Sequence, residues 1–131
     1  IRSCVAPGRG VLVEGAGGLL SPMGEAFDSR DLMTALRAVP VVVAANRLGA
    51  VHQVRAVLAA LPRWYRERAV VVLSGGKRDG AAASNAALLG EFEPGVRLVE
   101  LPWVKDWQRA GLLRPGVGEA LDQVARWVGW M

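Results

Sequence analysis

The chain has 131 residues, enough for one domain with a buried core, and 52% of them are hydrophobic while only 6% are aromatic. An aliphatic interior in a chain of this size is typical of an α/β protein. The formal net charge is +4, from 16 basic and 12 acidic residues. Because the arginines are scattered, we predict no nucleic-acid-binding stripe, although a mildly basic surface suits phosphorylated or carboxylated small molecules.

The composition also argues against a metal site built from cysteines and histidines, and against a membrane or secreted location. One cysteine, Cys4, and one histidine, His52, provide neither a disulfide pair nor a metal site built from these residues. No stretch reaches the roughly 18 apolar residues of a membrane span, and the first residues do not read as a secretory signal. We therefore expect a cytoplasmic protein that binds no membrane and no nucleic acid. Because the chain starts at Ile1 and not at Met, we expect a fragment, a processed product or a partner subunit.

The first predicted element is also the most informative. Residues 10–13 form an apolar run that predicts a buried parallel strand, and Glu14 ends it. A glycine-rich loop follows at Gly15, Ala16, Gly17 and Gly18. Open α/β sheets bind ligands at the carboxyl ends of their strands, and Mg²⁺ takes one or two carboxylates from a protein. Glycine N–H groups can approach an anion closely. The alternative is a solvated carboxylate on a tight turn.

The rest of the chain alternates between helical and strand-like patterns. After a loop at residues 19–27, Asp28 or Ser29 is suited to cap a helix. The patterns predict strands at residues 41–45, 69–73 and 96–101, and helices at residues 30–38, 48–61, 81–91 and 118–130. This order predicts a single α/β domain over residues 1–131, with a mostly parallel sheet and helices on both faces.

The carboxyl ends of parallel strands meet at one edge of a sheet, so we expect a functional edge there. The segments concerned are residues 14–18, 46–49, 74–77 and 102–105. The phosphate-binding pattern G-x-x-x-x-G-K-[ST] is absent. The Gly-Lys pair at residues 76–77 is followed by Arg78 and not by Ser or Thr, and the spacing before it does not fit the pattern. We expect the later tryptophans to anchor the core or an interface; these are Trp103, Trp107, Trp127 and Trp130.

Three segments, in this order and spacing, resemble the dethiobiotin synthetases. VLVEGAGG at residues 11–18, followed by LLSP, resembles the central motif of that family and is fairly specific. VPVVV at residues 39–43 with LGAVH at residues 48–52 resembles a second conserved stretch, and ELPWV at residues 100–104 a third. The resemblance covers nearly the whole chain but only the carboxyl-terminal half of the family's domain. It implies half of a P-loop NTPase-like α/β fold.

The resemblance implies an ATP-dependent ring closure in biotin synthesis, catalysed by a homodimer. In that family 7,8-diaminopelargonate takes up CO₂ as a carbamate, ATP phosphorylates the carbamate, and the second amine closes the ureido ring. Glu14 would ligate the Mg²⁺ that bridges the ATP phosphates, and the backbone of Gly15 to Gly18 would hold the carbamate. The carboxylate of the substrate would bind across the dimer interface at Leu48, Gly49, Ala50, Val51 and His52. The nucleotide would lie against Ser74, Pro102, Trp103 and Val104.

The chain also departs from the family. It lacks the P-loop half, with its lysine and a further metal-binding carboxylate, so we expect activity only with a P-loop-containing half or subunit, as a dimer or hetero-oligomer. The family usually has Asn where His52 stands, and an Asn-Asp pair near Ser74. An asparagine amide can pair a donor and an acceptor with the edge of adenine, whereas a serine hydroxyl can make only part of this pattern. The nucleotide preference therefore stays open. His52 is either a carboxylate ligand or an exposed polar residue.

Two further interpretations stay open. The chain could be another P-loop relative with a similar Glu-Gly loop, such as an amidotransferase-type synthase of cobalamin assembly. It could also be a non-catalytic partner subunit that keeps the interface and has lost the chemistry. The intact VEGAGG segment favours the synthetase, whereas the missing P-loop and the residues at Ser74 and His52 favour the non-catalytic subunit.

Overall fold

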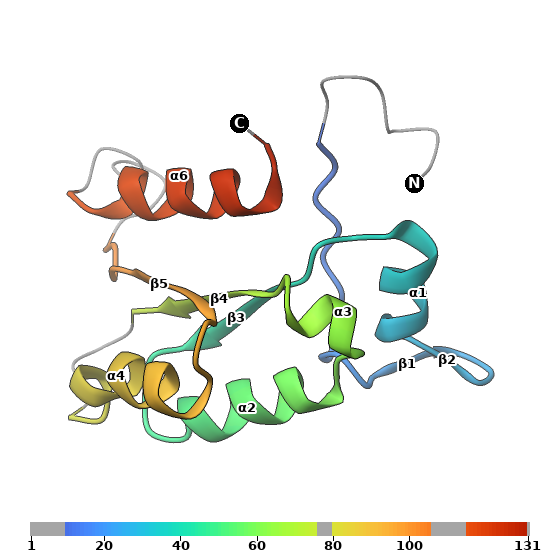
Figure 1. Cartoon of the computed structure of the whole chain (residues 1–131), viewed down its shortest axis with the longest axis horizontal. Helices are drawn as coiled ribbons and strands as arrows, with labels where there is room; N and C mark the ends of the chain where they lie inside the picture. The colour runs from blue at the N-terminus through green and yellow to red at the C-terminus, as the bar shows by residue number, and fades with distance from the viewer. Residues whose placement is uncertain (1–9, 76–79, 106–114, 131) are drawn as a thin grey trace. The chain divides into compact units, whose positions relative to one another are not determined.

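The computed structural model describes residues 10–75, 80–105 and 115–130, so Cys4, residues 76–77 and Trp107 lie outside the described residues (Figure 1). The described chain divides into two compact units, residues 10–38 with Trp130 and residues 39–129. The expectation of a single domain stays a prediction.

The larger unit is built around a three-stranded parallel sheet. Its strands follow the chain order, β3 (Val41–Ala45), β4 (Val70–Ser74) and β5 (Arg97–Leu101). Each strand pairs with the next over all five residues without a register shift. The central strand β4 buries its first four residues, Val-Val-Val-Leu. A continuous apolar run of this kind is typical of a parallel strand that is covered on both faces.

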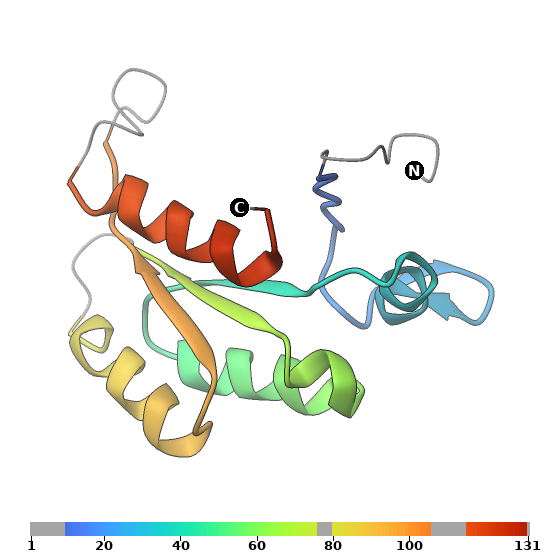
Figure 2. The ribbon, with the colours of Figure 1, turned by 45° about the horizontal axis from the view of Figure 1, so that its top comes forward.

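Helices cover both faces of this sheet (Figures 1 and 2). α2 (Ala50–Ala60) and α4 (Ala82–Phe92) pack on one face, and α6 (Val117–Val128) packs on the other, mainly against β5. A short helix, α3 (Arg63–Arg66), follows α2. The side chains of Val54, Leu58, Leu89 and Val117 are fully buried between helices and sheet. The predicted α/β class, with a mostly parallel sheet and helices on both faces, is confirmed.

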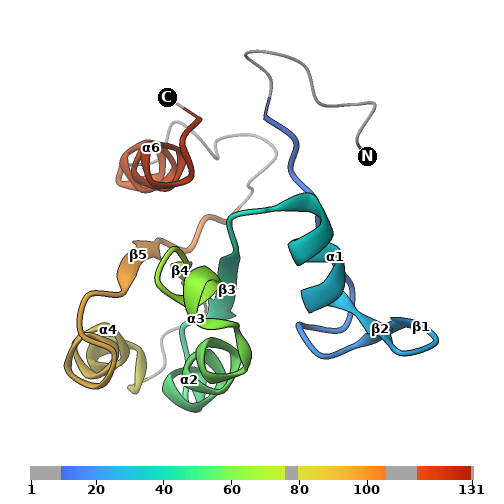
Figure 3. The same ribbon diagram turned by 45° about the vertical axis from the view of Figure 1, so that its right-hand side comes forward.

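The smaller unit contains a hairpin and a capped helix (Figure 3). β1 (Pro22–Gly24) pairs antiparallel with β2 (Phe27–Asp28), and α1 (Ser29–Leu36) follows directly. The Asp28 side chain accepts a hydrogen bond from the Arg30 N–H at 2.7 Å, and Asp31 accepts one from the Asp28 N–H at 2.8 Å. This reciprocal capping box confirms the predicted helix start, with Asp28 as the cap.

The predicted strand at residues 10–13 was wrong. These residues have no regular structure, and the Leu12 side chain is 75% exposed. A strand needs a neighbour for its backbone hydrogen bonds, and the hairpin of the smaller unit is already paired to itself. The predicted loop at residues 19–27 also contains β1, which is too short to show an alternating pattern.

One carboxylate of the larger unit joins three helices. The Glu93 side chain, only 8% exposed, follows α4 and accepts hydrogen bonds from Arg55 Nε of α2 at 2.9 Å and from Arg66 Nη2 of α3 at 2.6 Å. The hydrogen bond from Arg55 is the main reason that the pKa of Glu93 lies below its usual value; burial opposes this shift, and Arg66 adds to it. The two ion pairs therefore connect α2, α3 and the end of α4.

We predict that Glu93→Gln lowers the free energy of unfolding by about 1–2 kcal/mol at pH 7, because the amide makes weaker hydrogen bonds to both guanidinium groups. The control is Glu67→Gln, which breaks an exposed pair with Arg63 and should cost less than about 0.5 kcal/mol. Urea unfolding followed by circular dichroism measures both.

The same pair of proteins gives a pH test. The folded pKa of Glu93 is lowered, so its contribution is present above the unfolded value near 4.5 and is lost as the pH falls through the folded pKa. The difference in unfolding free energy between wild type and Glu93→Gln should therefore shrink below pH 4.5. An undiminished difference well below the folded pKa would contradict this account of Glu93.

Candidate functional site

The carboxyl ends of β3, β4 and β5 form one edge of the sheet, and the predicted segments after them lie together. The Asn46 N–H donates to the Ser74 carbonyl at 2.7 Å, and the Gly75 N–H donates to the Leu101 carbonyl at 2.6 Å. A Cβ atom at residue 75 would come within 2.6 Å of the Trp103 backbone nitrogen, so glycine permits this close approach. The predicted nucleotide-binding residues at Ser74 and at residues 102–103 are therefore neighbours.

A buried pair of asparagines organises this edge. Asn85 of α4 donates through Nδ2 to Asn46 Oδ1 at 2.8 Å and to the Arg47 carbonyl at 3.0 Å. Asn46 in turn donates through Nδ2 to Glu100 Oε1 of β5 at 3.1 Å. Both asparagines are at least nine-tenths buried, and no buried side-chain polar atom among the described residues lacks a partner. α4 thus holds the loop between β3 and α2 against the end of β5.

Residue 46 was predicted at the functional edge, whereas Asn85 was not identified from the sequence. Asn85 is buried on the same side of α4 as Leu89, four residues later. A polar side chain on the apolar stripe of a helix must find a hydrogen-bond partner, because burying it alone is costly. The position of Asn85 on the apolar stripe therefore predicts that its side chain has a buried partner, although the sequence could not show that the partner is Asn46.

The predicted substrate loop leads into the amino terminus of α2. Gly49 has a φ of +90°, a left-handed conformation that favours glycine, and no side chain caps the helix that follows it. The amino-terminal end of a helix carries a partial positive charge, which suits a carboxylate. His52 is exposed in the first turn of α2. Leu48, Gly49, Ala50, Val51 and His52 are therefore contiguous at the same edge as Asn46.

The glycine segment of the smaller unit forms a tight turn. Gly17 and Gly18 have φ values of +87° and +101°, and the Ser21 N–H donates to the Gly18 carbonyl at 3.2 Å. A Cβ atom at residue 17 would meet Ser21 Oγ at 2.5 Å, so this position requires glycine. Glu14 precedes the turn, is exposed, and makes no hydrogen bond or ion pair with the described residues.

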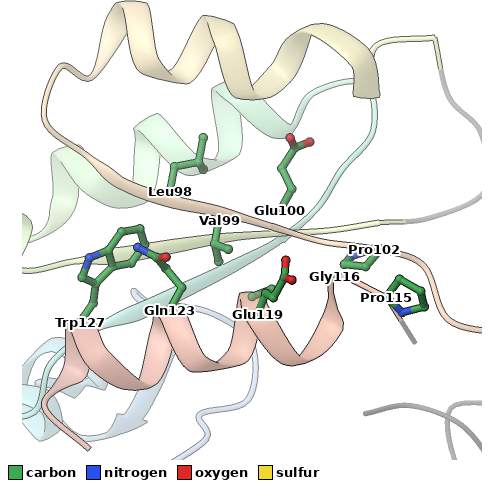
Figure 4. A pocket seen from close by; sticks show the side chains of 10 residues that line it. Leu98, Val99, Glu100, Pro102, Pro115, Gly116, Glu119, Gln123 and Trp127 are labelled. Atoms are coloured by element: carbon green, nitrogen blue, oxygen red, sulfur yellow. The ribbon is translucent and has the colours of Figure 1, made fainter. Parts of the chain in front are cut away.

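A shallow pocket of about 620 Å³ lies between β5 and α6, with Pro102 on its wall (Figure 4). Val99 points towards α6, whereas Glu100 points to the opposite side of the sheet, where it meets Asn46. α6 contributes a row of side chains one turn apart, Glu119, Gln123 and Trp127. The pocket therefore borders the predicted nucleotide-binding segment and is separated by the sheet from the asparagine pair.

Two tryptophans are too exposed to belong to the core. The Trp103 side chain is 65% exposed and that of Trp130 is 53% exposed, while Trp127 is half-buried. Of the two predicted roles, core packing therefore does not apply to Trp103 and Trp130, and an interface role stays a prediction. The described residues contain no group of three or more His, Cys, Asp or Glu side chains that could hold a metal ion. Nor does that part of the chain contain a helix long and apolar enough to cross a membrane.

Comparison with known proteins shows a relationship to the dethiobiotin synthetases. Over 110 residues, or 82% of its length, the chain is 36% identical to the ATP-dependent dethiobiotin synthetase of Anaeromyxobacter dehalogenans (strain 2CP-C). This chain is a relative of the dethiobiotin synthetases. The enzymes of that name from Caulobacter sp. (strain K31) and Mycobacterium sp. (strain JLS) are 32% identical over 78% of the chain and 47% identical over 47% of it.

The match covers only part of each relative. The chain spans about half the length of the Anaeromyxobacter and Caulobacter enzymes, 49% and 44% respectively. The shorter match to the Mycobacterium enzyme covers 27% of that enzyme. No family model matches the chain, and no solved structure matches it significantly.

We predict that Asn85→Ala destabilises the larger unit by about 1–3 kcal/mol, because it leaves Asn46 Oδ1 and the Arg47 carbonyl without their donor. Amide hydrogen exchange in residues 46–50 should become faster. Ser84→Ala is the matched control, since Ser84 is exposed and bonds only within its own turn of α4. Equal exchange in both variants would show that Asn85 does not hold the loop.

Proposed function

We propose that this chain forms the part of a dethiobiotin synthetase that holds the diamine substrate and borders the nucleotide. The observation that carries the proposal is the identity to dethiobiotin synthetases, which extends over most of the chain. The chain contains a tight glycine turn after Glu14 and a polar sheet edge at Asn46. The reaction would be the ATP-dependent carboxylation and ring closure of 7,8-diaminopelargonate, in biotin synthesis in the cytoplasm.

The proposed reaction requires the protein to position a carbamate, ATP and a second amine. One amine of the diamine takes up CO₂ as a carbamate, and ATP transfers its terminal phosphoryl group to a carbamate oxygen. The second amine then attacks the carbamate carbon, phosphate leaves, and the ureido ring closes. Phosphoryl transfer depends mainly on positioned charge and hydrogen-bond donors. The backbone N–H groups of residues 15–18 are the donors that we assign to the carbamate.

Glu14 has the chemistry of a Mg²⁺ ligand. Its carboxylate is exposed, has no ion-pair partner among the described residues, and follows directly on the apolar segment at residues 11–13. A Mg²⁺ ion bound with ATP needs only one or two protein carboxylates, because phosphate oxygens and water fill its other positions. The ion, when bound, would neutralise charge on the phosphates. Glu14 would hold it with a hard oxygen ligand.

The amino terminus of α2 is the proposed site for the carboxylate of the diamine. The partial positive charge of the helix and the exposed His52 both suit an anion there, and Gly49 lets the backbone turn closely into the helix. The nucleotide would lie against Ser74, Pro102, Trp103 and Val104, where the exposed Trp103 ring offers a flat apolar surface. We assign the phosphate-binding loop to a P-loop-containing half or subunit, within a dimer or hetero-oligomer.

The proposal is tested by co-producing the chain with the portion of the Anaeromyxobacter dehalogenans synthetase that it does not match. We expect ATP hydrolysis that depends on 7,8-diaminopelargonate, together with dethiobiotin formation. Glu14→Gln should lower turnover by about 100-fold or more, because an amide is a poor Mg²⁺ ligand. The control is Glu25→Gln, an exposed glutamate in the turn of the hairpin. An inactive wild-type assembly would favour a non-catalytic subunit.

His52→Ala should raise the KM for the diamine roughly tenfold and change kcat little, because it removes a contact made equally in the ground and transition states. Gln53→Ala, the exposed neighbour in the same helical turn, is the control and should leave KM unchanged. Steady-state kinetics of the same assembly measures both constants. A fall in kcat with a constant KM would assign His52 a different role.

A further inference from the structure

One serine side chain lies against the glycine turn of the smaller unit. Ser29 is the first residue of α1, and its hydroxyl donates a hydrogen bond to the Gly18 carbonyl at 3.3 Å. A Cβ atom at residue 15 would lie 3.6 Å from the same Ser29 Oγ. Ser29 therefore contacts both ends of the segment from Gly15 to Gly18, although it belongs to the helix that follows the hairpin.

The proton of the Ser29 hydroxyl goes to Gly18. Ser29 Oγ also lies 3.7 Å from Met23 Sδ of β1. A serine hydroxyl has only one proton and a thioether sulfur is a weak acceptor, so the carbonyl oxygen takes the hydrogen bond. The Gly18 carbonyl also accepts from the Ser21 N–H at 3.2 Å. Because a carbonyl oxygen has two lone pairs, both acceptor positions of Gly18 are used.

The capped start of α1 holds Ser29 in place. Asp28, the residue before it, accepts hydrogen bonds from the Arg30 N–H at 2.7 Å and from Arg30 Nη2 at 2.6 Å. Asp31, two residues after it, accepts from the Asp28 N–H at 2.8 Å. The capping box thus fixes the backbone on both sides of Ser29. The hydroxyl that contacts the glycine turn therefore has a fixed origin.

The anchored carbonyl sets the direction of a backbone donor. In a planar trans peptide group the carbonyl and the next N–H point in opposite directions, so the Leu19 N–H points away from Ser29. The N–H groups of residues 15–19 donate to no backbone carbonyl among the described residues. A Cβ atom at residue 18 would meet nothing within 4 Å, so the space beside Gly18 is open. The turn thus offers free donors next to open space.

We propose that Ser29 is a positioning residue for the phosphoryl-transfer site, because its bond to the Gly18 carbonyl holds the free N–H groups of residues 15–19 in the arrangement that receives the carbamate. This inference rests on the proposed function, which assigns donors of the turn to the carbamate. Donors stabilise developing charge best when they are already aimed at it before the reaction. Ser29 acts through the turn and is not itself a contact of the substrate.

The kinetic test uses the full chain co-produced with the unmatched portion of the Anaeromyxobacter dehalogenans synthetase. Ser29→Ala should lower kcat for diamine-dependent ATP hydrolysis roughly tenfold, because the donors of the turn are no longer held in place. The KM for ATP should stay unchanged, since the segments assigned to the nucleotide lie in the larger unit. Ser29→Thr keeps the hydroxyl and should restore most of the lost kcat.

The control variant removes a hydroxyl from the same helix. Thr34 Oγ1 is exposed and donates at 2.7 Å to the Arg30 carbonyl within α1, so Thr34→Ala should leave kcat unchanged. In the chain alone, NMR should show faster amide exchange at Ser21 in Ser29→Ala, because the carbonyl that it bonds is less firmly held. Ser29→Thr and Thr34→Ala should exchange like the wild type there. Circular dichroism reports whether each variant folds.

The two measurements separate this proposal from the proposed function. The wild-type kcat in Ser29→Ala, an impaired Ser29→Thr, or unchanged exchange at Ser21 in Ser29→Ala would each overturn the role of Ser29. An inactive wild-type assembly, together with faster Ser21 exchange in Ser29→Ala alone, would support the anchoring of the turn and count against the synthetase activity. Lower kcat with rescue by Ser29→Thr supports both.

Discussion

The larger unit depends on the burial of β4. Its residues Val70, Val71 and Leu73 are almost completely buried, and both neighbouring strands pair with it over their full lengths. Because strands that are buried on both faces must satisfy every backbone group by pairing, β4 fixes the register of β3 and β5 together. That common register aligns residues 46, 75 and 102 at one edge, and the loops that carry the candidate site start from there.

Polar contacts then give this edge a defined shape. Asn85 reaches from α4 to the loop after β3, and Asn46 reaches from that loop to Glu100 of β5. Apolar packing alone would leave the loop free to shift, because it has no direction, whereas paired amide hydrogen bonds are satisfied in only a few geometries. At the other side of the same helix layer, Glu93 joins α2 and α3 to the end of α4 through two guanidinium groups. α4 is thus held near both of its ends by directional contacts.

Much of the larger unit could be predicted from the sequence, because its signals are local. The strands expected at residues 41–45, 69–73 and 96–101 agree with β3, β4 and β5 to within one residue at each end, since they are mainly apolar and are followed by turn or proline signals. Asp28 was identifiable as a cap because its chemistry acts within one turn. α3 was missed because one helical turn has no periodicity to detect.

Features that depend on distant partners could not be predicted in this way. The Asn46–Asn85 contact joins residues 39 positions apart, so nothing local marks it. Residues 10–13 have strand-like composition, but composition does not supply a neighbour. For Glu14 and His52 the structure defines exposure and local conformation, while their assigned roles stay predictions because each involves a ligand.

The apolar segments that lack partners share one physical explanation. Val11 to Val13 and the outer side of β3 have the composition of buried strands, yet both are exposed in the described chain. Exposed apolar surface of this kind is a liability for a protein that works alone, and selection against aggregation would add charges to it. Its persistence is understandable if these segments are covered in the functional assembly. The chain spans about half the length of the Anaeromyxobacter enzyme, and no strand among the described residues pairs with the outer side of β3.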